Sequence, residues 1–425
     1  MKKLLAKADE QKAYLLKKMG EDRSIMIGDP AIDWVMGGYK RGCSNLFYGP
    51  SKSGKTTVAM ILAGIEQKKT NGGLVLIFDS EYANDMNKDP EVVERWKAAG
   101  LDPDLVLAVS SNEVNELFTG LGDLEADLKT TRQGMIDGVE VKKIPNYINI
   151  AAIIVDSWGG IQSEQAKEKM NAGNLSGAAN SYGGNAKTIN PIIQTILRIS
   201  ATYGITSLHI QHCIENMDKD PRTGAYKGPK WILLGGQKLR YLSQSITFIE
   251  TVEAGDSLFN ADGLPVKDAG GVAVGKRVRI RCEKSRKQVE GRKAESFINF
   301  RDCTFANKSV TLFNLAFGLG VIPHAKFPEK DAKGKPKLGP DGEPIMKENN
   351  QWYLIGDQKI KGKDATIAAM ATDQKLFDFV WKSTLESNSS DAVGVKMGAE
   401  EGVGSDAPDE DAKALEELSQ QTAEA

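Results

Sequence analysis

Residues 45–69, NLFYGPSKSGKTTVAMILAGIEQKK, decide the fold of this chain. The stretch starts as a short apolar run, passes through a turn rich in glycine, serine and lysine, and continues with apolar residues at helical spacing. A strand, a glycine-containing turn and a helix in this order are typical of the first unit of an α/β fold.

More apolar runs with polar ends follow this unit, and near-continuous runs of this kind are typical of parallel strands covered on both faces. They are GLVLIFDSE (73–81), INIAAIIVDSW (148–158) and ITSLHIQH (205–212), and the helical pattern NPIIQTILRISATYG (190–204) lies before the last of them. Later runs predict antiparallel strands: SITFIETVEA (245–254), KRVRIRCEKSR (276–286) and AESFINF (294–300). We therefore predict an α/β fold whose mostly parallel sheet has helices on both faces and is extended by antiparallel strands.

We expect four parts along the chain. Residues 1–43 hold an amphipathic helix and an extended, turn-rich linker, and residues 44–305 hold the α/β core. Helical runs and a hairpin in residues 306–385 predict a small α+β domain, which contains the exposed lysine-bearing insertion KDAKGKPKLGPDGEP (330–344). Residues 386–425 are acidic and rich in serine and alanine, so we expect a disordered tail.

The overall composition excludes few classes of protein. The 425-residue chain has 40% hydrophobic residues, 26% charged residues and a net charge of −2, a composition that is typical of a globular protein. No apolar run is long enough for a membrane span, and the N-terminus lacks the apolar centre of a signal peptide. The four cysteines are scattered without metal-type pairing, which fits a reducing cytosol, and the lack of a membrane-spanning run predicts no membrane partner.

The turn in residues 49–57, GPSKSGKTT, fits the phosphate-binding pattern G-x-x-x-x-G-K-[ST]. Its glycines let backbone N–H groups close around a phosphate, and the following helix points the positive end of its dipole at that phosphate. Lys55 is expected to reach the β- and γ-phosphate oxygens of ATP, and the Thr56 hydroxyl to ligate Mg²⁺. The candidate nucleotide-binding residues of this turn are Gly49, Pro50, Ser51, Lys52, Ser53, Gly54, Lys55, Thr56 and Thr57. A chance glycine-rich turn is the alternative, which the strand and helix around it disfavour.

Two carboxylates end predicted strands. Asp156 directly follows an unbroken apolar run, where ATPases with this turn place the carboxylate that helps to hold Mg²⁺. A helix cap is the alternative role for Asp156. The strand next after the phosphate turn and its helix ends in Asp79 and Glu81, of which Glu81 is favoured as a candidate general base that polarises the attacking water. A solvated strand end is the alternative for Glu81.

The order and spacing of these motifs resemble the RecA family of DNA recombinases. The stretches that carry the resemblance are GPSKSGKTT, FDSEYAND (78–85), IIVDSWGGI (153–161), IQHCIEN (210–216), LLGGQKLRY (233–241) and RVRIRCEKSRKQVEGRKAESFINF (277–300). The resemblance covers about residues 21–385, and within the family it is greatest to the UvsX-type strand-exchange proteins of T-even phages. It implies a RecA-like ATPase core that uses ATP and Mg²⁺.

The resemblance also implies roles for single residues. Glu81 takes the position of the catalytic base, Asp85 that of the residue touching the adenine, and His212 that of a glutamine beside the γ-phosphate. Lys284 and Arg286 match the basic pair that the family donates across the subunit interface to the neighbour's γ-phosphate. A solvated strand end is the alternative for this pair. His209, on the opposite face of the strand from His212, is expected to be a core histidine.

Residues 214–234 combine basic and aromatic side chains, as binding of single-stranded nucleic acid requires. The candidate DNA-binding residues are Lys219, Arg222, Tyr226, Lys227, Lys230 and Trp231. Glu215, Asp218 and Asp220 dilute the positive charge, so composition alone predicts only a polar loop. The glycine- and asparagine-rich residues 159–187 are a second candidate DNA loop, because they are long and irregular for a compact domain.

The function that these features predict is that of a DNA-dependent ATPase that forms a helical filament on single-stranded DNA. It would pair that strand with homologous duplex DNA and exchange strands in recombination, repair and phage replication. The N-terminal helix would dock on the adjacent subunit, although a helix packed on its own core is the alternative. A recombination mediator and a single-strand-binding protein are further expected partners. A ring-forming helicase-like motor and a P-loop ATPase switch that binds no DNA remain as alternatives, and the acidic tail either competes with DNA or serves solubility.

Overall fold

The computed structural model describes residues 24–83, 90–129, 131–136, 139–145, 149–161, 182–220, 222–233, 237–252, 258–260, 264–266, 271–285 and 290–387. All of them belong to one compact unit that ends at Val393. The N-terminal helix, Asp85, Arg286, the acidic tail and most of the second candidate DNA loop lie outside the described residues.

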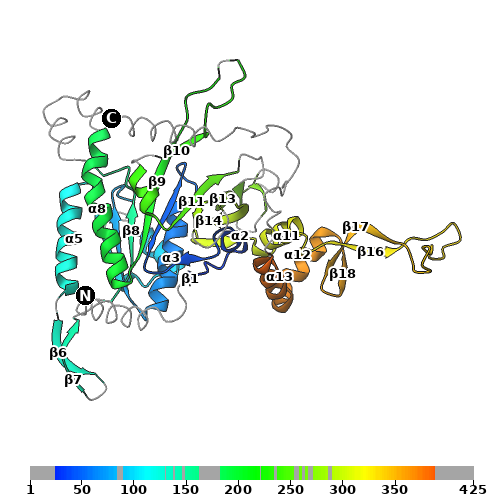
Figure 1. Cartoon of the computed structure of the whole chain (residues 1–425), viewed down its shortest axis with the longest axis horizontal. Coiled ribbons are helices and arrows are strands. Elements are labelled where there is room, and N and C mark those ends of the chain that lie inside the picture. Colours follow the sequence, from blue (N-terminus) through cyan, green and yellow to red (C-terminus); the bar gives the residue numbers. More distant parts are fainter. Residues whose placement is uncertain are drawn as a thin grey trace, which may run out of the picture. The chain divides into compact units, whose positions relative to one another are not determined.

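Eleven of the described strands form one sheet (Figure 1). Its parallel part has the order β11 (Ser245–Thr251), β3 (Ser44–Gly49), β9 (Thr206–Glu215), β8 (Ile150–Asp156), β4 (Leu74–Asp79) and β5 (Val106–Ser110). Antiparallel strands continue it beyond β11: β13 (Gly275–Ser285), β14 (Lys293–Asn299) and β15 (Thr304–Ala306). β10 (Trp231–Leu233) pairs with β9, and β12 (Leu258–Phe259) with β13. The prediction of a mostly parallel sheet extended by antiparallel strands is confirmed.

Helices cover both faces of this sheet (Figure 1). On β3, Phe47 packs into the same apolar cluster as Val58 of α3 (Lys55–Lys69), whereas Leu46 and Tyr48 pack into the cluster that contains Ile192 of α8 (Tyr182–Tyr203). Every residue of β3 is buried, which is why its sequence is an apolar run rather than an alternating one. The other helices and hairpin of this part are α4 (Glu91–Ala98), η1 (Pro103–Leu105), α5 (Val114–Lys129), β6 (Thr131–Ile136), β7 (Val139–Pro145) and α9 (Gln237–Leu242).

A buried helix lies in the segment before the core, where we predict an extended linker. This helix, α2 (Pro30–Met36), is flanked by the paired strands β1 (Ser24–Ile25) and β2 (Tyr39–Lys40). Asp29 caps it by accepting a hydrogen bond from the Ile32 amide (2.9 Å), and Gly37 ends it in the left-handed conformation. The extended prediction was wrong here, although Asp-Pro at the start and glycine at the end are recognised helix boundaries.

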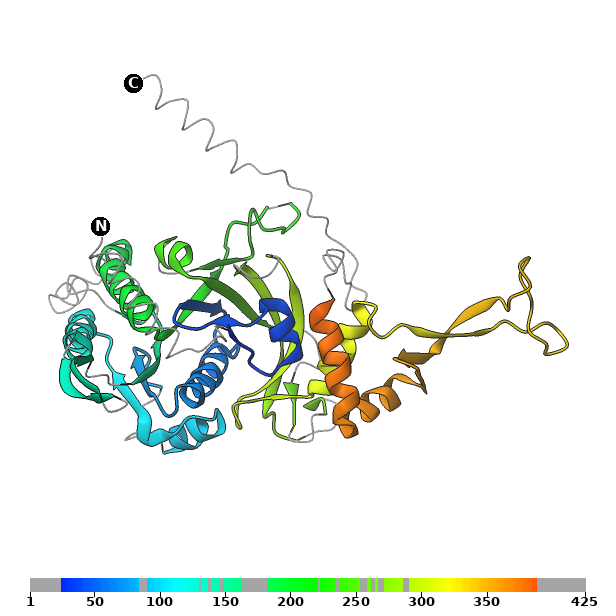
Figure 2. The same cartoon turned by 60° about the horizontal axis from the view of Figure 1, so that its bottom comes forward.

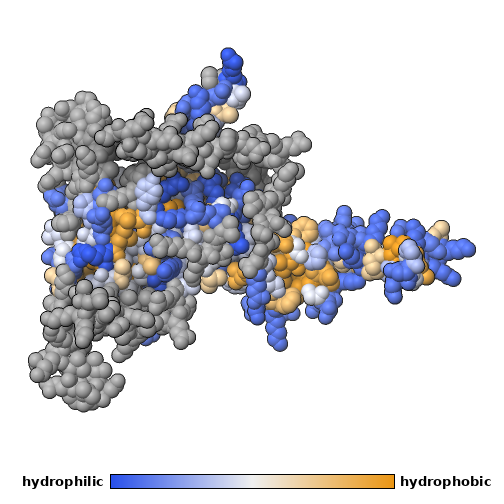
Figure 3. Space-filling model, in the orientation of Figure 1, coloured by the Kyte–Doolittle hydropathy of each residue, from blue (hydrophilic) through white to orange (hydrophobic). Residues whose placement is uncertain are grey.

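The chain after the core builds a smaller group of elements around its own apolar cluster. They are α11 (Lys308–Gly318), β16 (His324–Pro328), β17 (Met346–Ile355), β18 (Gln358–Lys361), α12 (Lys363–Thr372) and α13 (Gln374–Glu386). Figure 2 shows α13 (orange) beside α2 (blue), and both α11 and α13 contact α2. The predicted hairpin is formed by β17 and β18, and the predicted insertion 330–344 is exposed and predominantly hydrophilic (Figure 3).

Among the helices of the described residues, none is both long enough and apolar enough to cross a lipid bilayer.

Candidate active site

The turn between β3 and α3 has the backbone of an anion-binding site. Gly54 precedes α3 in a left-handed conformation (φ 91°), and no side chain caps the helix there. The first N–H groups of α3 are therefore available to an anion, and the helix dipole favours a negative charge at this end. The buried hydroxyl of Ser53 has no hydrogen-bond partner among the described residues. An uncapped helix start and a buried orphan hydroxyl fit a bound phosphate group.

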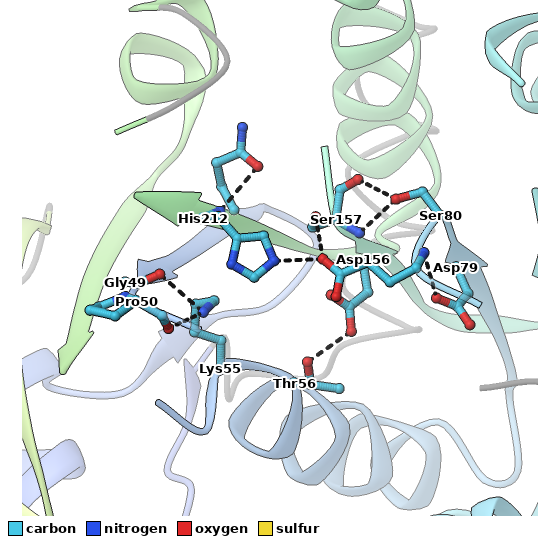
Figure 4. A network of polar contacts seen from close by, with 11 residues as sticks. Gly49, Pro50, Lys55, Thr56, Asp79, Ser80, Asp156, Ser157 and His212 are labelled. Atoms are coloured by element: carbon cyan, nitrogen blue, oxygen red, sulfur yellow. Dashed lines mark hydrogen bonds and ion pairs between the residues drawn. The ribbon is translucent and has the colours of Figure 1, made fainter. Parts of the chain in front are cut away.

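Lys55 is the first residue of α3, and its side chain reaches back to this turn. Its Nζ donates to the carbonyl oxygens of Gly49 (3.0 Å) and Pro50 (2.6 Å), as Figure 4 shows. The side chain is 4% exposed, and desolvation lowers the pKa of its ammonium group. Two of the three N–H donors of Lys55 are therefore used by the turn.

Thr56 and Asp156 form a ready pair of oxygen ligands. The Thr56 hydroxyl donates to Oδ2 of Asp156 at 2.8 Å, from the first turn of α3 to the end of β8 (Figure 4). Burial raises the pKa of Asp156 to about 6, against the effect of the Thr56 hydrogen bond. The described residues contain no cluster of three or more His, Cys, Asp or Glu side chains suited to a metal ion. Mg²⁺ commonly uses one or two protein oxygens together with phosphate oxygens, so this pair fits a Mg²⁺–nucleotide rather than a free metal site.

Glu81 is held by two side chains at the mouth of the same site. Its Oε1 lies 2.5 Å from Nε2 of His212 and accepts a hydrogen bond from the Ser157 hydroxyl at 2.7 Å. The hydrogen bond from His212 lowers the pKa of Glu81, with Ser157 acting in the same direction against desolvation. Glu81 is therefore an ionised acceptor, as a residue that orients water for attack must be.

Neighbouring residues that the sequence analysis did not select keep Glu81 and Ser157 in place. Asp79 accepts from the Glu81 amide (3.1 Å), and the Ser80 hydroxyl donates to the Ser157 carbonyl (2.6 Å) while accepting from the Ser157 amide (3.1 Å). Asp79 of β4 is paired with Asp156 of β8. The same Asp-Ser dipeptide follows both apolar runs, and this repeat was the signal available in the sequence.

A cavity of about 540 Å³ brings most of these residues together. It is lined by Ser51, Lys52, Ser53, Gly54, Lys55, Thr56, Thr57, Glu81, Asp156, Ile210, His212, Lys276 and Phe300. Lys276 comes from β13 and Phe300 directly follows β14, and no motif in the sequence pointed to either as a site residue. The structure therefore joins the phosphate turn, both strand-end carboxylates and His212 in one site.

The two histidines of β9 lie on different faces. His209 is fully buried; its Nδ1 accepts from Trp158 Nε1 (3.2 Å), and burial lowers its pKa to about 3, so it is a neutral core residue. The prediction of a core position for His209 is confirmed, although its Nε2 has no hydrogen-bond partner among the described residues. The prediction that the strand ends at His212 was wrong, because β10 pairs with Cys213, Ile214 and Glu215 and extends β9.

The candidate DNA loop is a β-hairpin rather than an open loop. Beyond β9 and β10, Lys219 and Tyr226 form an isolated bridge, with Nζ of Lys219 4.4 Å from the tyrosine ring centre. Both also contact the Glu215 carboxylate, and Lys227 pairs with Asp218 at 3.5 Å. Two of the lysine ammonium groups are therefore paired with carboxylates of the hairpin itself.

The other candidate DNA-binding residues of the hairpin differ in their side-chain contacts. Trp231 donates to Oε2 of Glu250 on β11 (3.0 Å), and Nζ of Lys230 stands 5.3 Å from the Trp231 ring centre. Trp231 is therefore anchored to the core sheet. Arg222 is exposed at the turn and makes no ion pair with any described residue.

Lys284 is remote from the cavity of its own chain. Its Nζ donates to the carbonyls of Arg240 (3.3 Å) and Tyr241 (2.8 Å) at the end of α9. On the sheet, Lys284 pairs with Ile246, which pairs with Leu46 near the start of β3, whereas the phosphate turn leaves the far end of that strand. That offset is about 10 Å along the strand, in addition to the width of two strand spacings.

Curated proteins similar to this chain include several named protein RecA. No protein-family model matches the chain. The chain is 25% identical over 372 residues to protein RecA of Amycolatopsis mediterranei, covering 85% of this chain and 83% of the relative. It is 24% identical over 364 residues to protein RecA of Symbiobacterium thermophilum (82% and 80%), and 35% identical over 155 residues to that of Corynebacterium urealyticum (35% and 38%). The mixed sheet is thus a RecA-like α/β core, and relatives that match over four-fifths of both chains support a RecA-family protein.

Proposed function

We propose that this chain is an ATP-dependent DNA recombinase of the UvsX type, which assembles on single-stranded DNA and exchanges strands with a homologous duplex. The relatives named RecA support a recombinase-type function in general. The observation that carries the proposal is the contact between Glu81 and His212, because it joins the candidate base to the strand that continues into the candidate DNA hairpin.

In this proposal the cavity binds ATP. The first N–H groups of α3 and Lys55 hold the phosphates, and Thr56 and Asp156 hold Mg²⁺, which would neutralise charge on the phosphate oxygens. Glu81 orients the attacking water by accepting its hydrogen bond, and Ser157 fixes the direction of the carboxylate. Asp85 is proposed to contact the adenine.

His212 is proposed to couple the nucleotide to DNA. In the described arrangement it donates to Glu81, and its other ring nitrogen, Nδ1, is buried without a hydrogen-bond partner among the described residues. A γ-phosphate competes with Glu81 for the same N–H. A shift of His212 toward the phosphate would release Glu81 for water and move the base of the hairpin, three residues further along β9.

Assembly is proposed to complete the site. Lys284 cannot serve its own cavity from its place beside α9, so its proposed role is to donate charge, with Arg286, to the nucleotide of a neighbouring subunit. The N-terminal helix of residues 1–43 is proposed to make the head-to-tail contact that orders such subunits in a filament. Residues 44–305 and 306–385 would then be core and small C-terminal domain, followed by the acidic tail from residue 386. A mediator and a single-strand-binding protein are proposed as further partners in the bacterial cytoplasm.

The test measures single-stranded DNA binding with Mg²⁺ and a non-hydrolysable ATP analogue, with ADP, and without nucleotide. We expect the analogue to tighten binding by tenfold or more for the unchanged protein but not for His212→Ala, while His212→Gln keeps part of the effect because an amide also donates to phosphate. Strand exchange should require ATP, and Lys55→Ala should abolish both hydrolysis and exchange.

The same samples separate the alternatives. Closed hexameric rings in electron micrographs would indicate the helicase-like motor. Failure to bind DNA at low salt with the ATP analogue would indicate the switch and refute the recombinase.

A further inference from the structure

We propose that Lys276 is a second cation of the phosphate site, supplied by the same chain, which contacts a phosphate oxygen of the bound nucleotide. This inference rests on the proposed binding of ATP in the cavity. It concerns a residue outside the phosphate-turn motif and outside the pair proposed to arrive from a neighbouring subunit.

The backbone position of Lys276 is fixed by close packing. It follows Gly275, where an added Cβ would stand 2.1 Å from the Phe259 ring and 2.4 Å from the Ile298 carbonyl. Lys276 itself pairs with Ile298 of β14 on one side and Leu258 of β12 on the other. This corner of the sheet is therefore closely packed, and it borders the phosphate turn, because an added Cβ at Gly54 would stand 2.7 Å from Cδ1 of Ile298.

The side chain of Lys276 lines the cavity. Its Nζ lies 3.4 Å from the Lys52 carbonyl, inside the turn that is expected to wrap a phosphate, and 5.7 Å from the ring centre of Phe300. The hydrogen bond is long, and no described carboxylate pairs with this ammonium. Two N–H donors of Lys276 thus have no partner in the described structure.

The number of N–H donors that Lys55 has left for the nucleotide favours a phosphate contact by Lys276. Lys55 spends two of its donors on Gly49 and Pro50, which leaves one for the nucleotide. A polyphosphate presents several charged oxygens, and the cavity also contains the carboxylates Glu81 and Asp156. β13, which carries Lys276, lies on the opposite side of β3 from β8 and β4, near whose ends Asp156 and Glu81 stand. A second ammonium from that side offsets the phosphate charge that Lys55 alone leaves unmatched.

The alternative is that Lys276 only braces the turn through the Lys52 carbonyl and packs on Phe300. Lys276→Gln separates the two, because a glutamine amide can still donate to that carbonyl but carries no charge. Lys276→Arg restores the charge. Lys293→Gln is the matched control, since Lys293 is an exposed lysine at the start of β14 that does not line the cavity.

The experiment measures displacement of a fluorescent ATP analogue by MgATP and by inorganic tripolyphosphate, which has phosphates but no base or sugar. We expect Lys276→Gln to lower the affinity for both competitors by about tenfold or more. Lys276→Arg should bind both competitors with nearly the affinity of the unchanged protein, and Lys293→Gln should bind them with unchanged affinity. The salt dependence of tripolyphosphate binding should also fall in Lys276→Gln.

Two results would overturn the inference. One is unchanged affinity for both competitors in a folded Lys276→Gln protein, and the other is loss of MgATP affinity with tripolyphosphate unaffected, which would assign Lys276 to the base or sugar. If the unchanged protein bound neither competitor, the proposed nucleotide site itself would be wrong, and the inference would fail with it.

Discussion

Asp33 is a fully buried carboxylate in α2 that accepts hydrogen bonds from the amides of Ile27 (2.7 Å) and Gly28 (2.9 Å). Burial raises its pKa to about 7 in spite of these bonds. An unfolded aspartate has a pKa near 4, so between about pH 4 and 7 the folded state binds a proton that the unfolded state has lost. The contribution of Asp33 to stability is therefore complete below about pH 4 and is lost as the pH rises to 7.

Asp33→Asn should remove this pH dependence. The measured quantity is the decrease in the free energy of unfolding in urea between pH 5 and pH 7. We expect this decrease to be smaller in Asp33→Asn than in the unchanged protein, by on the order of 1–2 kcal/mol. Asp364→Asn, at an exposed carboxylate of α12, is the control and should keep the original pH profile. An Asp33→Asn protein with that same profile would show that Asp33 is ionised in the fold.

Gly49 lies where β3 closely approaches the neighbouring strand β11. Its φ of 157° is tolerated by few residues, and an added Cβ would stand 1.9 Å from the Ile249 carbonyl oxygen. We expect Gly49→Ala to lower the free energy of unfolding by more than about 3 kcal/mol. Gly291→Ala, at φ 87° with nothing within 4 Å, carries backbone strain without a clash and should cost about 1 kcal/mol. Equal losses in the two variants would mean that the backbone of β3 moves to make room.

At the scale of elements, acidic residues in the β9–β10 hairpin, the candidate DNA-binding loop, hold its shape as well as dilute its positive charge. The acidic residues that dilute its charge build its shape: Asp220 accepts from the amides of Arg222 (2.7 Å) and Thr223 (3.0 Å) and so forms the turn. Glu215 and Asp218 hold Tyr226 and Lys227 across the hairpin. The basic residues consequently differ in how freely they can reach a phosphate.

Arg222 should matter more for DNA binding than Lys219. Lys219 is engaged by Glu215 and Tyr226, whereas Arg222 has no ionic partner among the described residues. We expect Arg222→Gln to weaken single-stranded DNA binding and to reduce the slope of log K against log salt by about 0.7, the value for one phosphate contact. Lys219→Gln should have a smaller slope change. The reverse order would mean that the hairpin opens and re-pairs when DNA binds.

The elements themselves were predictable to different degrees. The strands of the core were evident because a strand buried on both faces must be apolar throughout, as β3 and β8 are. The helix α2 was missed because all of it is buried, so it lacks the polar face that marks a surface helix. The extension of β9 past His212 was missed because it depends on pairing with β10, fifteen or more residues later in the chain.

At the scale of the whole molecule, the place of Lys284 opposite the phosphate turn of its own chain gives a test of assembly. In the proposed filament, Lys284→Ala subunits would lack the proposed donated cation and Glu81→Gln subunits the proposed base, so each variant alone should lose most DNA-stimulated hydrolysis. In a random mixture of equal amounts, about a quarter of the interfaces would join an intact Glu81 to an intact Lys284 across two subunits. We therefore expect the mixture to recover a clear fraction of the activity.

The mixing experiment has a direct control. Lys284→Ala mixed with a protein that carries both Lys284→Ala and Glu81→Gln contains no interface with both residues intact and should stay inactive. If the first mixture is also inactive while both variants bind nucleotide and DNA, Lys284 acts within its own chain, through the carbonyls at the end of α9.

The amino-acid sequence by itself determined the class of the fold, the phosphate turn and the candidate residues Lys55, Thr56, Glu81 and Asp156, because these depend on local patterns that a few neighbouring residues define. Only the tertiary structure decided that Ser157 and His212 hold Glu81, that Lys276 enters the cavity, and that Lys284 stays away from it. These contacts join strands that are far apart in the chain. They depend on the order and register of strands in the sheet, which long-range packing sets and local sequence does not encode.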